Sequence, residues 1–410
     1  MPKQSATPSP PAATAGERLA ALREAGLYRR MRTVGSAQGP RIELDGREVL
    51  LLCSNDYLGL ANDPAVVGAA AEGLQRYGAG TASVRFIAGL FTPHVELEND
   101  LADFLETEAA ITFTSCWNAN QALLDTLCDK RTWVLSDELN HASIIDGIRL
   151  ARPGGKAVYE HADVTSLEQA LGRVPDGARC LIVTDGVFSM EGDLAPLPDL
   201  VELADSHEAT LIVDDSHGLG VLGLEGRGTA EHFGIDGRID IVTGTLGKAL
   251  GGAAGGFVAG SGPLCQLLEQ RSRGQLFSNG LPPSVACGAR AALGELTTNP
   301  GCLRRLRANV NRFRSGVAGL GLKPLDGASA IVPILVGETR NAIAFSERLL
   351  AEGVFAIGFG YPVVPEGTAR IRVQLSATLT AEQIDDAVAA FGRVATEQGL
   401  LERVPARGRR

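Results

Sequence analysis

Thr210-Leu-Ile-Val-Asp214-Asp-Ser-His217 and Ile239-Asp-Ile-Val-Thr243-Gly-Thr-Leu-Gly-Lys248 are the two stretches that decide the fold. Each begins with a short, mostly apolar run and then passes into small and polar residues. A third run of the same kind, Cys180–Thr184, precedes them. Runs like these are typical of strands buried on both faces of a parallel sheet.

Working outward, strand-like and helix-like segments alternate on the N-terminal side of these runs. Helical patterns cover Pro64–Tyr77 and Pro93–Leu105, and strand-like runs follow at Ala109–Phe113, Thr132–Leu135 and Ala157–Tyr159. This alternation predicts an α/β fold with helices on both faces of the sheet.

The pattern changes after Thr298, where a smaller α+β unit is expected. Its predicted helices are Cys302–Leu320, Asn341–Glu352 and Ala381–Gly399, the last capped by Thr380 with Gln383 three residues on. Its predicted strands are Ala330–Val336, Val354–Ile357 and Arg370–Leu375. The expected division is therefore a disordered tail at 1–16, an N-terminal helix and strands at 17–60, a large domain at 61–297 and a small domain at 298–410. Within 17–60 we expect a helix at Glu17–Arg32 and strands at Arg41–Leu44 and Val49–Cys53.

Composition excludes several classes of protein. The net charge of −10 and the lack of a long basic run argue against a nucleic-acid partner. No long apolar stretch predicts a membrane span, and the N-terminus lacks a signal-peptide pattern. The seven cysteines include no CxxC pair, which favours reduced thiols in the cytoplasm over disulfides or a zinc site. Arginines on the 302–320 helix form either a solvated face or a patch for an anionic substrate tail: Arg304, Arg305, Arg307, Arg312 and Arg314.

The polar residues that follow the strongest strands are the candidates for chemistry, because open α/β sheets bind ligands beyond the carboxyl ends of their strands. Asp214 ends one strand, and a carboxylate there could keep a pyridine nitrogen protonated, which makes the ring a better electron sink. His217 could then reach a neighbouring ring oxygen. The alternative is a helix-capping aspartate beside a solvent histidine. A metal site is a weaker interpretation of this segment, because no HExxH spacing occurs.

Lys248 follows the next strand, among small residues. Desolvation would lower the pKa of its amine and allow it to form an imine with an aldehyde. Thr245 offers a hydroxyl to a phosphate, and glycines at 251, 252, 255 and 256 allow close backbone approach. A phosphate-binding GxxxxGK[ST] loop is not satisfied, since Ala249 follows the lysine. A surface lysine in a glycine-rich loop is the remaining alternative.

Two further segments open helices after strands. His141 could stack on a flat aromatic ring, or it could simply cap or pack against its helix. The backbone amides near Cys116 suit a phosphate, although an ordinary helix cap explains the segment equally well. In the small domain, Arg370 and Arg372 share one strand face. Either could clamp a carboxylate in two-point fashion or form a salt bridge at a sheet edge.

Taken together, the motifs resemble the α-oxoamine synthases, a branch of the fold-type I pyridoxal-phosphate enzymes, and within them the glycine C-acetyltransferases (2-amino-3-ketobutyrate CoA ligases). The resemblance covers about Glu17 to Leu400. It rests on Ser54-Asn-Asp-Tyr-Leu-Gly-Leu60, Ala82-Ser-Val-Arg-Phe-Ile-Ala-Gly89, Leu139-Asn-His-Ala-Ser-Ile-Ile-Asp-Gly147, Thr184-Asp-Gly-Val-Phe-Ser-Met-Glu-Gly192, Asp214-Asp-Ser-His217, Gly244-Thr-Leu-Gly-Lys248 and Tyr361-Pro-Val-Val-Pro365. It implies a large domain with a mostly parallel seven-stranded sheet and a smaller C-terminal domain.

The resemblance also implies roles at matching positions. Lys248 would carry pyridoxal 5'-phosphate as a Schiff base and remove the glycine α-proton, with His141 stacked on the ring. Asp214 would pair with the ring nitrogen and His217 with the ring hydroxyl. Further residues would lie beside the cofactor: Cys116, Trp117, Ser189 and Thr245. Asn55 and Arg372 would bind the substrate carboxylate. The protein would be a homodimer with its active site at the interface, where a segment with Ser278 and Asn279 reaches the phosphate bound by the partner subunit.

The implied reaction condenses glycine with an acyl-CoA, acetyl-CoA first among donors, to give 2-amino-3-oxobutanoate and coenzyme A. This chain departs from the acetyltransferase pattern at Leu90, Phe91, Trp117 and Gly360, which suggests a changed acyl pocket. The alternatives are a sister enzyme with another acyl-CoA, acyl-carrier or amino-acid substrate, such as 8-amino-7-oxononanoate synthase or 5-aminolevulinate synthase, and a non-catalytic scaffold. Retention of Lys248 and its ring partners argues against the scaffold.

Overall fold

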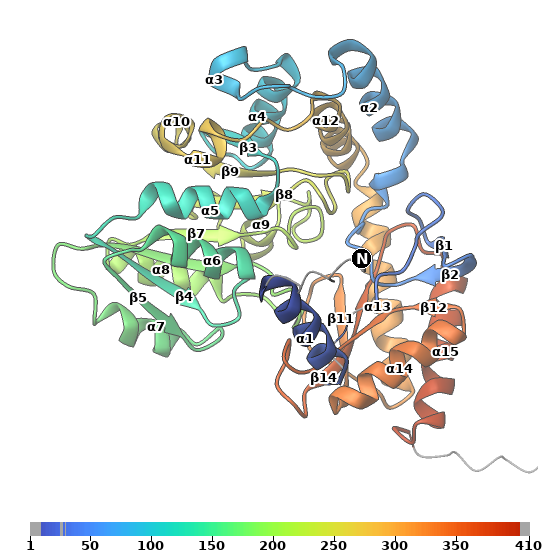
Figure 1. The fold of residues 1–410 in the computed structure, drawn as a ribbon. Coiled ribbons are helices and arrows are strands. Elements are labelled where there is room, and N and C mark those ends of the chain that lie inside the picture. Colours follow the sequence, from blue (N-terminus) through green and yellow to red (C-terminus); the bar gives the residue numbers. More distant parts are fainter. Residues whose placement is uncertain (1–9, 25–27, 29, 402–410) are drawn as a thin grey trace, which may run out of the picture.

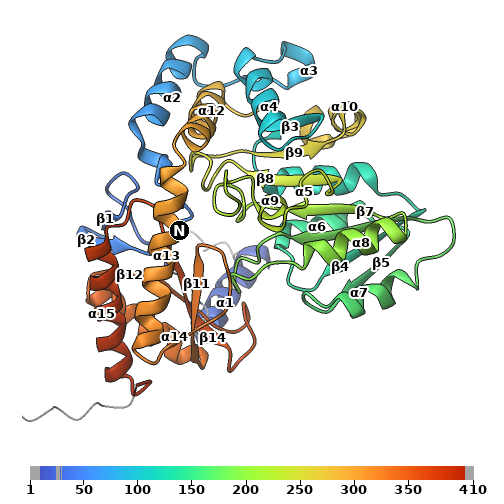
Figure 2. The same cartoon turned by 180° about the vertical axis from the view of Figure 1, so that it is seen from behind.

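The protein is described by a computed structural model that covers residues 10–24, 28 and 30–401. Its large domain is built on a seven-stranded sheet in the order β3-β9-β8-β7-β6-β4-β5 (Figures 1 and 2). Only β9 runs antiparallel to its neighbours. The strands are β3 (Ala109–Phe113), β4 (Thr132–Asp137), β5 (Gly155–Tyr159), β6 (Arg179–Asp185), β7 (Thr210–Asp214), β8 (Ile241–Thr245) and β9 (Gly256–Gly260). The predicted fold class is therefore confirmed.

Both faces of this sheet are buried, as the apolar runs predict. Along β6, Ile182 packs into one hydrophobic cluster with α7 (Val164–Leu171) and α8 (Leu197–Ser206). Leu181 and Val183 face the opposite cluster with α5 (Cys116–Leu127) and α6 (Ala142–Ala151). Successive strand residues point to opposite faces, so a strand covered on both sides must be apolar throughout.

The sequence prediction missed β9. Its residues, Gly256-Phe-Val-Ala-Gly260, form a short strand with glycine at each end, and glycine weakens the strand signal. In the structure the strand is fully buried between β3 and β8. A side chain at Gly256 would meet the backbone nitrogen of Cys116 at 2.2 Å, so the close approach of β9 to α5 requires glycine there.

The small domain contains a four-stranded antiparallel sheet in the order β10-β11-β14-β13. The predicted strand Val354–Ile357 is wrong as a single element. Its first two residues form β12, which pairs with β2 (Arg47–Leu51) in a separate sheet, and its last residue, Ile357, begins β13. The elements are α13 (Gly301–Gly319), β10 (Lys323–Pro324), β11 (Ile331–Gly337), α14 (Thr339–Ala351), β12 (Val354–Phe355), β13 (Ile357–Phe359), β14 (Ala369–Gln374) and α15 (Ala381–Glu397).

The predicted capping box of α15 is present, with Thr380 and Gln383 bonding each other's backbone N–H. Three of the five arginines on α13 have structural partners: Arg307 donates to Gly223 O, Arg312 pairs with Asp385, and Arg314 donates to Leu325 O at 2.5 Å. Arg304, Arg305 and Arg312 are exposed, as a solvated face requires, whereas Arg307 and Arg314 are half-buried and bind backbone carbonyls.

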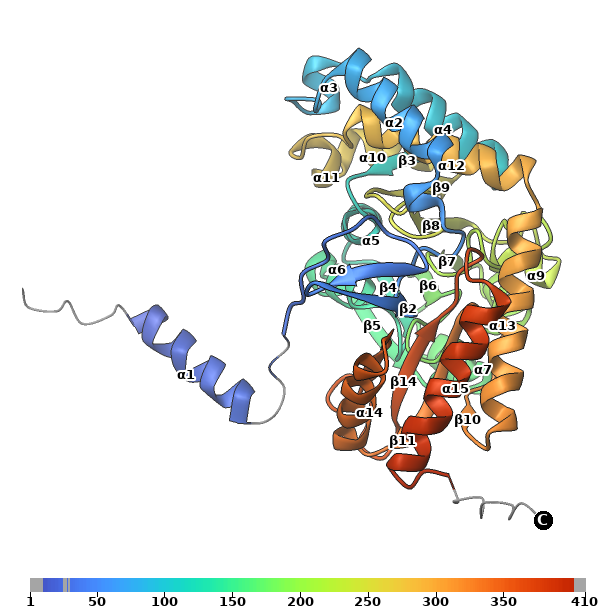
Figure 3. The ribbon, with the colours of Figure 1, turned by 90° about the vertical axis from the view of Figure 1, so that its right-hand side faces the viewer.

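The N-terminal region differs from the expectation. Helix α1 spans Pro10–Glu24, so it begins before the predicted Glu17 and ends before Arg32. Proline is tolerated in the first turn of a helix, where its missing N–H has no partner to lose. The predicted tail at 1–16 overlaps this helix at 10–16, and the rest of it, 1–9, lies outside the described residues. Figure 3 shows α1 extending away from the remaining elements.

The remaining elements connect the two domains. Helices α2, α4 and α12 pack together beside the large sheet, and α12 leads into α13 (Figure 1). One hydrophobic cluster runs from Leu97 and Leu101 in the large domain to Ile331 and Phe391 in the small domain. The elements are β1 (Arg41–Leu44), η1 (Leu60–Asn62), α2 (Pro64–Tyr77), α3 (Arg85–Ala88), α4 (Thr92–Phe104), α9 (Thr229–Phe233), α10 (Gly262–Arg271), α11 (Arg273–Leu276) and α12 (Pro283–Thr298).

Within the described part of the chain, no helix has the length and apolar character needed to span a membrane. The same residues contain no cluster of histidine, cysteine and acidic side chains suited to a metal ion.

Candidate active site

Three neighbouring parallel strands end in aspartates at the same edge of the large sheet. Asp137 ends β4, Asp185 ends β6 and Asp214 ends β7, and the Asp185 and Asp214 backbones lie side by side in the ladder. The turn after β8 brings Lys248 to this edge. The carboxyl ends of the strands therefore gather the side chains that the sequence singled out.

A cavity of about 190 Å³ lies at this edge. Eight of the predicted site residues line it: Cys116, Trp117, His141, Ser189, Asp214, His217, Thr245 and Lys248. Residues without a predicted role complete the lining: Ser115, Ser143, Asp185, Val187 and Ser216. Four predicted residues do not line it: Asn55, Ser278, Asn279 and Arg372.

The Lys248 amine has no hydrogen-bond or ion-pair partner among the described residues, although it lies in the field of three acidic groups. Burial lowers the pKa of Lys248, while the nearby acidic groups, the Asp214 carboxylate first among them, oppose that change. A lysine with a lowered pKa is more readily a neutral nucleophile or base. The loop that carries it is thus an internal wall of the cavity rather than a surface turn.

Asp214 is buried and held by a polar network beneath the cavity. Its carboxylate accepts from Asn120 Nδ2 at 2.6 Å and from the Ser216 N–H at 3.1 Å. Asn120 is itself oriented by Thr243, whose hydroxyl donates to Asn120 Oδ1 at 2.8 Å. The Cys116 thiol lies 3.7 Å from the same carboxylate, and burial raises the pKa of that thiol well above its ordinary value. Any contact between Cys116 and a phosphate would therefore come from its backbone.

His141 stands at the N-terminus of α6 with its ring on the cavity wall. Its Nδ1 lies 2.8 Å from the Ser143 hydroxyl, and its backbone N–H donates to Asp185 at 3.0 Å. The Trp117 ring meets it edge-on, with centroids 5.9 Å apart. Burial lowers the pKa of His141, which favours the neutral ring. The capping interpretation is confirmed, and because His141 also lines the cavity, its stacking on a flat aromatic ring stays a prediction.

His217 is not the solvent histidine of the alternative interpretation. Its Nδ1 lies 2.8 Å from the hydroxyl of the buried Tyr57, and that hydroxyl accepts from Gln374 Nε2 at 3.1 Å. Since Gln374 already donates to Tyr57, the Tyr57 proton is directed to His217 Nδ1. Burial lowers the pKa of His217 well below its ordinary value, so the ring is neutral and carries its proton on Nε2.

The part of the cavity lined by the N-terminus of α5 is suited to an anion. Ser115 caps α5 by accepting from the Asn118 N–H at 3.1 Å, which leaves the first turn of the helix facing the cavity at Cys116 and Trp117. A helix N-terminus favours negative charge. The nearby Thr245 hydroxyl accepts from the Gly247 N–H at 3.1 Å and lies 3.2 Å from the Gly255 carbonyl.

Arg370 and Arg372 share one face of β14, as predicted, but their surroundings differ. Arg370 forms an ion pair with Glu191 at 3.1 Å. None of the described carboxylates pairs with Arg372, which instead donates to the Ser189 carbonyl at 3.1 Å and lies over the Phe359 ring. Arg370 thus forms the predicted salt bridge, although on an inner strand and not at a sheet edge, and Arg372 remains available to a carboxylate.

The other predicted substrate and partner positions lie outside the cavity. Asn55 accepts from Gln374 Nε2 and thereby joins the Tyr57–His217 network. Ser278 and Asn279 follow the strongly exposed Phe277, and their suggested reach to a second subunit stays a prediction.

The departures from the acetyltransferase pattern lie in different surroundings. Trp117 lines the cavity, whereas Leu90 and Phe91 do not, and Phe91 packs edge-on against Tyr77 and His94. A side chain at Gly360 would meet Thr339 Oγ1 at 2.4 Å, so a packing requirement accounts for that glycine. Trp117 is left as the departure that bears on ligand space in this cavity.

Asp185 is a cavity residue that the sequence interpretation did not single out. Burial and the neighbouring charge of Asp214 raise the pKa of Asp185 well above its ordinary value. Its backbone N–H donates to Asn140 at 2.8 Å, which locks the β6 end to the His141 segment. Its position at the end of a strong apolar strand was the signal that could have identified it.

The residues present fit pyridoxal 5'-phosphate. The cavity combines an unpartnered amine, a buried carboxylate, a neutral imidazole on its wall and the N-terminus of α5. These groups match an aldehyde, a ring nitrogen, a flat ring face and a phosphate in turn. Leaving the Lys248 amine partly buried without any partner is costly, and a ligand that bonds to it removes that cost.

Comparison with known proteins agrees with this chemistry. The aminotransferase class I and II family matches residues 47–391. The chain is 46% identical to 8-amino-7-oxononanoate synthase of Symbiobacterium thermophilum, over 94% of this chain and 98% of that protein. It is 44% identical to the mitochondrial 2-amino-3-ketobutyrate coenzyme A ligase of Bos taurus, over 94% and 92%. A serine palmitoyltransferase structure from Sphingomonas wittichii superposes with a TM-score of 0.89 at 31% identity, over 95% of this chain and 98% of that one. The chain therefore belongs to the aminotransferase class I and II family, within which it is a pyridoxal-phosphate-dependent α-oxoamine synthase.

Proposed function

We propose that this protein is a C-acyltransferase that condenses glycine with an acyl-CoA, acetyl-CoA being the preferred donor. The observation that carries the amino-acid part is the Arg372 guanidinium, which has no carboxylate partner among the described residues and contacts the cavity residue Ser189. A bidentate arginine is the usual means of holding a substrate carboxylate.

When bound, pyridoxal phosphate supplies an aldehyde that takes up amines and a protonated ring that withdraws electrons from the substrate α-carbon. Asp214 would hold the proton on the ring nitrogen, and the Nε2–H of His217 would donate to the ring hydroxyl oxygen. His141 would cover one ring face. The Thr245 hydroxyl and the α5 N-terminus would hold the phosphate.

Lys248 is the proposed base. Its lowered pKa favours a neutral amine, which can take the α-proton of glycine while Arg372 holds the glycine carboxylate. In the overall reaction a carbon–carbon bond forms between the glycine α-carbon and the acyl carbonyl. The carbon–sulfur bond of the thioester breaks, and coenzyme A leaves as the thiol. Lys248 holds the α-proton for the leaving thiolate or for water.

A second candidate function is condensation with a longer acyl donor or another amino acid. The relatives support it, because 8-amino-7-oxononanoate synthase is as similar to this chain as the 2-amino-3-ketobutyrate ligase is. Trp117 bears on this choice, since it lines the cavity and departs from the acetyltransferase pattern. A different side chain at position 117 would change the space that the acyl group can occupy.

Thiol release with purified protein distinguishes the two candidates. Glycine, alanine and serine would each be combined with acyl-CoAs from acetyl to octanoyl, with Lys248→Ala as the inactive control. We expect the highest kcat/KM with glycine and acetyl-CoA. A preference for alanine or for long acyl chains would instead support the sister function, and no thiol release from any pair would contradict both.

A further inference from the structure

The turn formed by residues 188–193, between β6 and α8, joins the two domains beside the cavity. It is closed by the Val187–Leu194 bridge and by the Gly192 N–H, which donates to the Phe188 carbonyl at 2.7 Å. Ser189 in this turn lines the cavity. We call this segment the 188–193 turn.

The small domain holds one side of the 188–193 turn. Arg372 donates to the Ser189 carbonyl at 3.1 Å, and Arg370 donates to the Met190 carbonyl at 3.2 Å and pairs with Glu191. Ser329 donates to the Gly192 carbonyl at 2.7 Å. Because its backbone carbonyl binds Arg372, the turn determines where that guanidinium lies.

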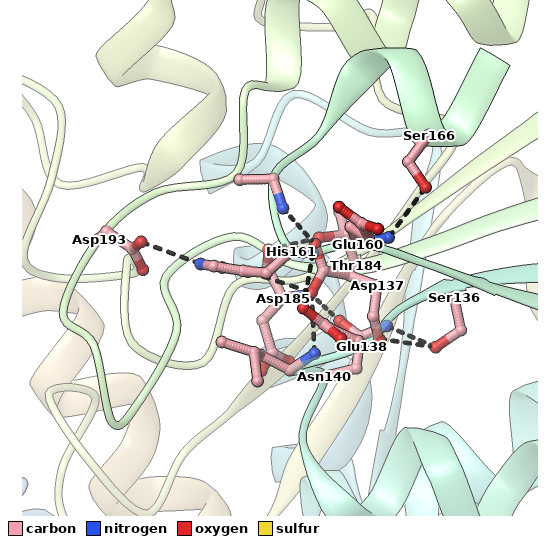
Figure 4. A network of polar contacts seen from close by, with 12 residues as sticks. Ser136, Asp137, Glu138, Asn140, Glu160, His161, Ser166, Thr184, Asp185 and Asp193 are labelled. Atoms are coloured by element: carbon pink, nitrogen blue, oxygen red, sulfur yellow. Dashed lines mark hydrogen bonds and ion pairs between the residues drawn. The ribbon is translucent and has the colours of Figure 1, made fainter. Parts of the chain in front are cut away.

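The large domain holds the other side through His161, at the end of β5. Figure 4 shows His161 between Asp193 and the Asp137–Glu138 segment. Its Nε2 lies 3.0 Å from Asp193, and its Nδ1 lies 3.1 Å from Asp137. The Phe188 ring packs edge-on against the imidazole, with centroids 4.3 Å apart.

Both ring nitrogens of His161 face carboxylates, and a histidine can donate from both only as the imidazolium. Burial alone would lower the pKa of His161, but the hydrogen bonds and charges of Asp137 and Asp193 outweigh it and raise the pKa to about 10. Other charged groups lie near: Glu138 accepts from the His161 N–H at 3.1 Å, and Glu191 carries the Arg370 ion pair. His161 is the one described side-chain partner of Asp193.

We propose that His161 is a positioning residue, which as an imidazolium fixes the 188–193 turn to the large domain and thereby sets Arg372 where the carboxylate of the amino-acid substrate binds. The inference rests on the proposed function for the identity of that carboxylate. His161 itself would touch neither substrate nor cofactor, but it would control the position of Arg372, which binds the substrate. Outer contacts of this kind commonly hold functional side chains within a fraction of an ångström.

The test compares two ligands that share an amine and differ in the carboxylate. Glycine and methylamine would be titrated into the holoenzyme, with the change in its visible absorption reporting each dissociation constant. In His161→Gln we expect the glycine dissociation constant to rise about tenfold, the change that a loss of about 1.4 kcal/mol produces. The methylamine constant should stay unchanged. Asp193→Asn is a second variant, since it breaks the same link from the other side.

Glu160→Gln is the matched control. It removes a charge next to His161, on an exposed side chain with no described polar partner, and should alter neither dissociation constant. Equal weakening of both ligands in His161→Gln and Asp193→Asn, or no weakening of glycine, would overturn the inference. Arg372→Lys separates it from the proposed function. Suppose that the native protein prefers glycine to methylamine and that Arg372→Lys loses this preference. If His161→Gln and Asp193→Asn both keep it, only the His161 inference fails. If native protein shows no preference, both fail.

Discussion

At the scale of single residues, the proton on His217 is controlled by a neighbour from a distant part of the chain. Tyr57 donates to His217 Nδ1 because its own oxygen is occupied by Gln374. The Nε2–H is therefore available to a ring oxygen in the cavity. Without this contact the His217 ring would populate both tautomers, so its Nε2 would be a donor in some molecules and an acceptor in others.

Tyr57→Phe tests this control. The buried ring keeps its packing, but His217 loses its partner, and we expect kcat/KM for glycine to fall about tenfold, as a deficit of about 1.4 kcal/mol implies. Cofactor affinity should change less, because Lys248 and Asp214 are untouched. Steady-state kinetics and a cofactor titration followed by absorbance would measure both. Unchanged kcat/KM would show that the tautomer is fixed by something else.

The strand-end residues could be predicted from the sequence, whereas their supports could not. Asp214 and Lys248 follow apolar runs directly, and parallel strands bring such ends to one edge of the sheet. Arg372 was a candidate from its place on a strand and from the resemblance, but its contact with the Ser189 carbonyl was not predictable, nor was the contact of Tyr57 with His217, because each joins segments far apart in the chain. The absence of an acidic partner for Arg372 depends on Glu191 pairing with Arg370 instead, which no local pattern encodes.

At the scale of elements, the N-terminus of α5 depends on its contact with β9. Gly256 lies so close to Cys116 that an added methyl group would meet backbone atoms that cannot move away cheaply. The sequence did not predict this strand, because a glycine-bounded run of five residues has little strand propensity. Its pairing with β3 and β8 comes from tertiary context.

Gly256→Ala should therefore destabilise the protein by about 2 kcal/mol, within the range for overpacking a filled core. It should also weaken binding of the cofactor phosphate, since the first turn of α5 must shift. Urea unfolding and cofactor titration would measure the two effects. Gly294→Ala is the control, because this helical position has open space around it and should be neutral or slightly stabilising. Equal stability of the two variants would contradict the tight β9–α5 contact.

The 188–193 turn is expected to make stability depend on pH. The pKa of His161 is about 10 in the folded protein and about 6.5 when unfolded, so its contribution is fully present below about pH 6.5. That contribution is lost as pH rises through about 10. We expect Asp193→Asn to lower the free energy of unfolding by about 2 kcal/mol at pH 6 and by much less near pH 10. Urea unfolding of both proteins across this range would measure the difference, and a gap independent of pH would contradict a charged His161.

At the scale of the whole molecule, the proposed substrate site draws on residues from both the large and the small domain, which also share a hydrophobic core. Lys248 and its ring partners come from the large domain, and Arg372 comes from the small domain through the 188–193 turn. The α/β fold with its mostly parallel sheet could be predicted because its strands and helices have strong, regular patterns. The single predicted strand at Val354–Ile357 could not be divided in advance, since its halves pair with different sheets.

Lys248 is the residue to which we propose that the cofactor bonds, and chemical trapping tests this bond most directly. Borohydride reduction of the holoenzyme, followed by proteolysis and mass spectrometry, would identify the modified lysine. We expect pyridoxyl modification on the peptide that contains Lys248, and loss of the visible absorption band in Lys248→Ala. Modification at Lys130, Lys156 or Lys323 instead, or a modified peptide that persists in Lys248→Ala, would contradict it.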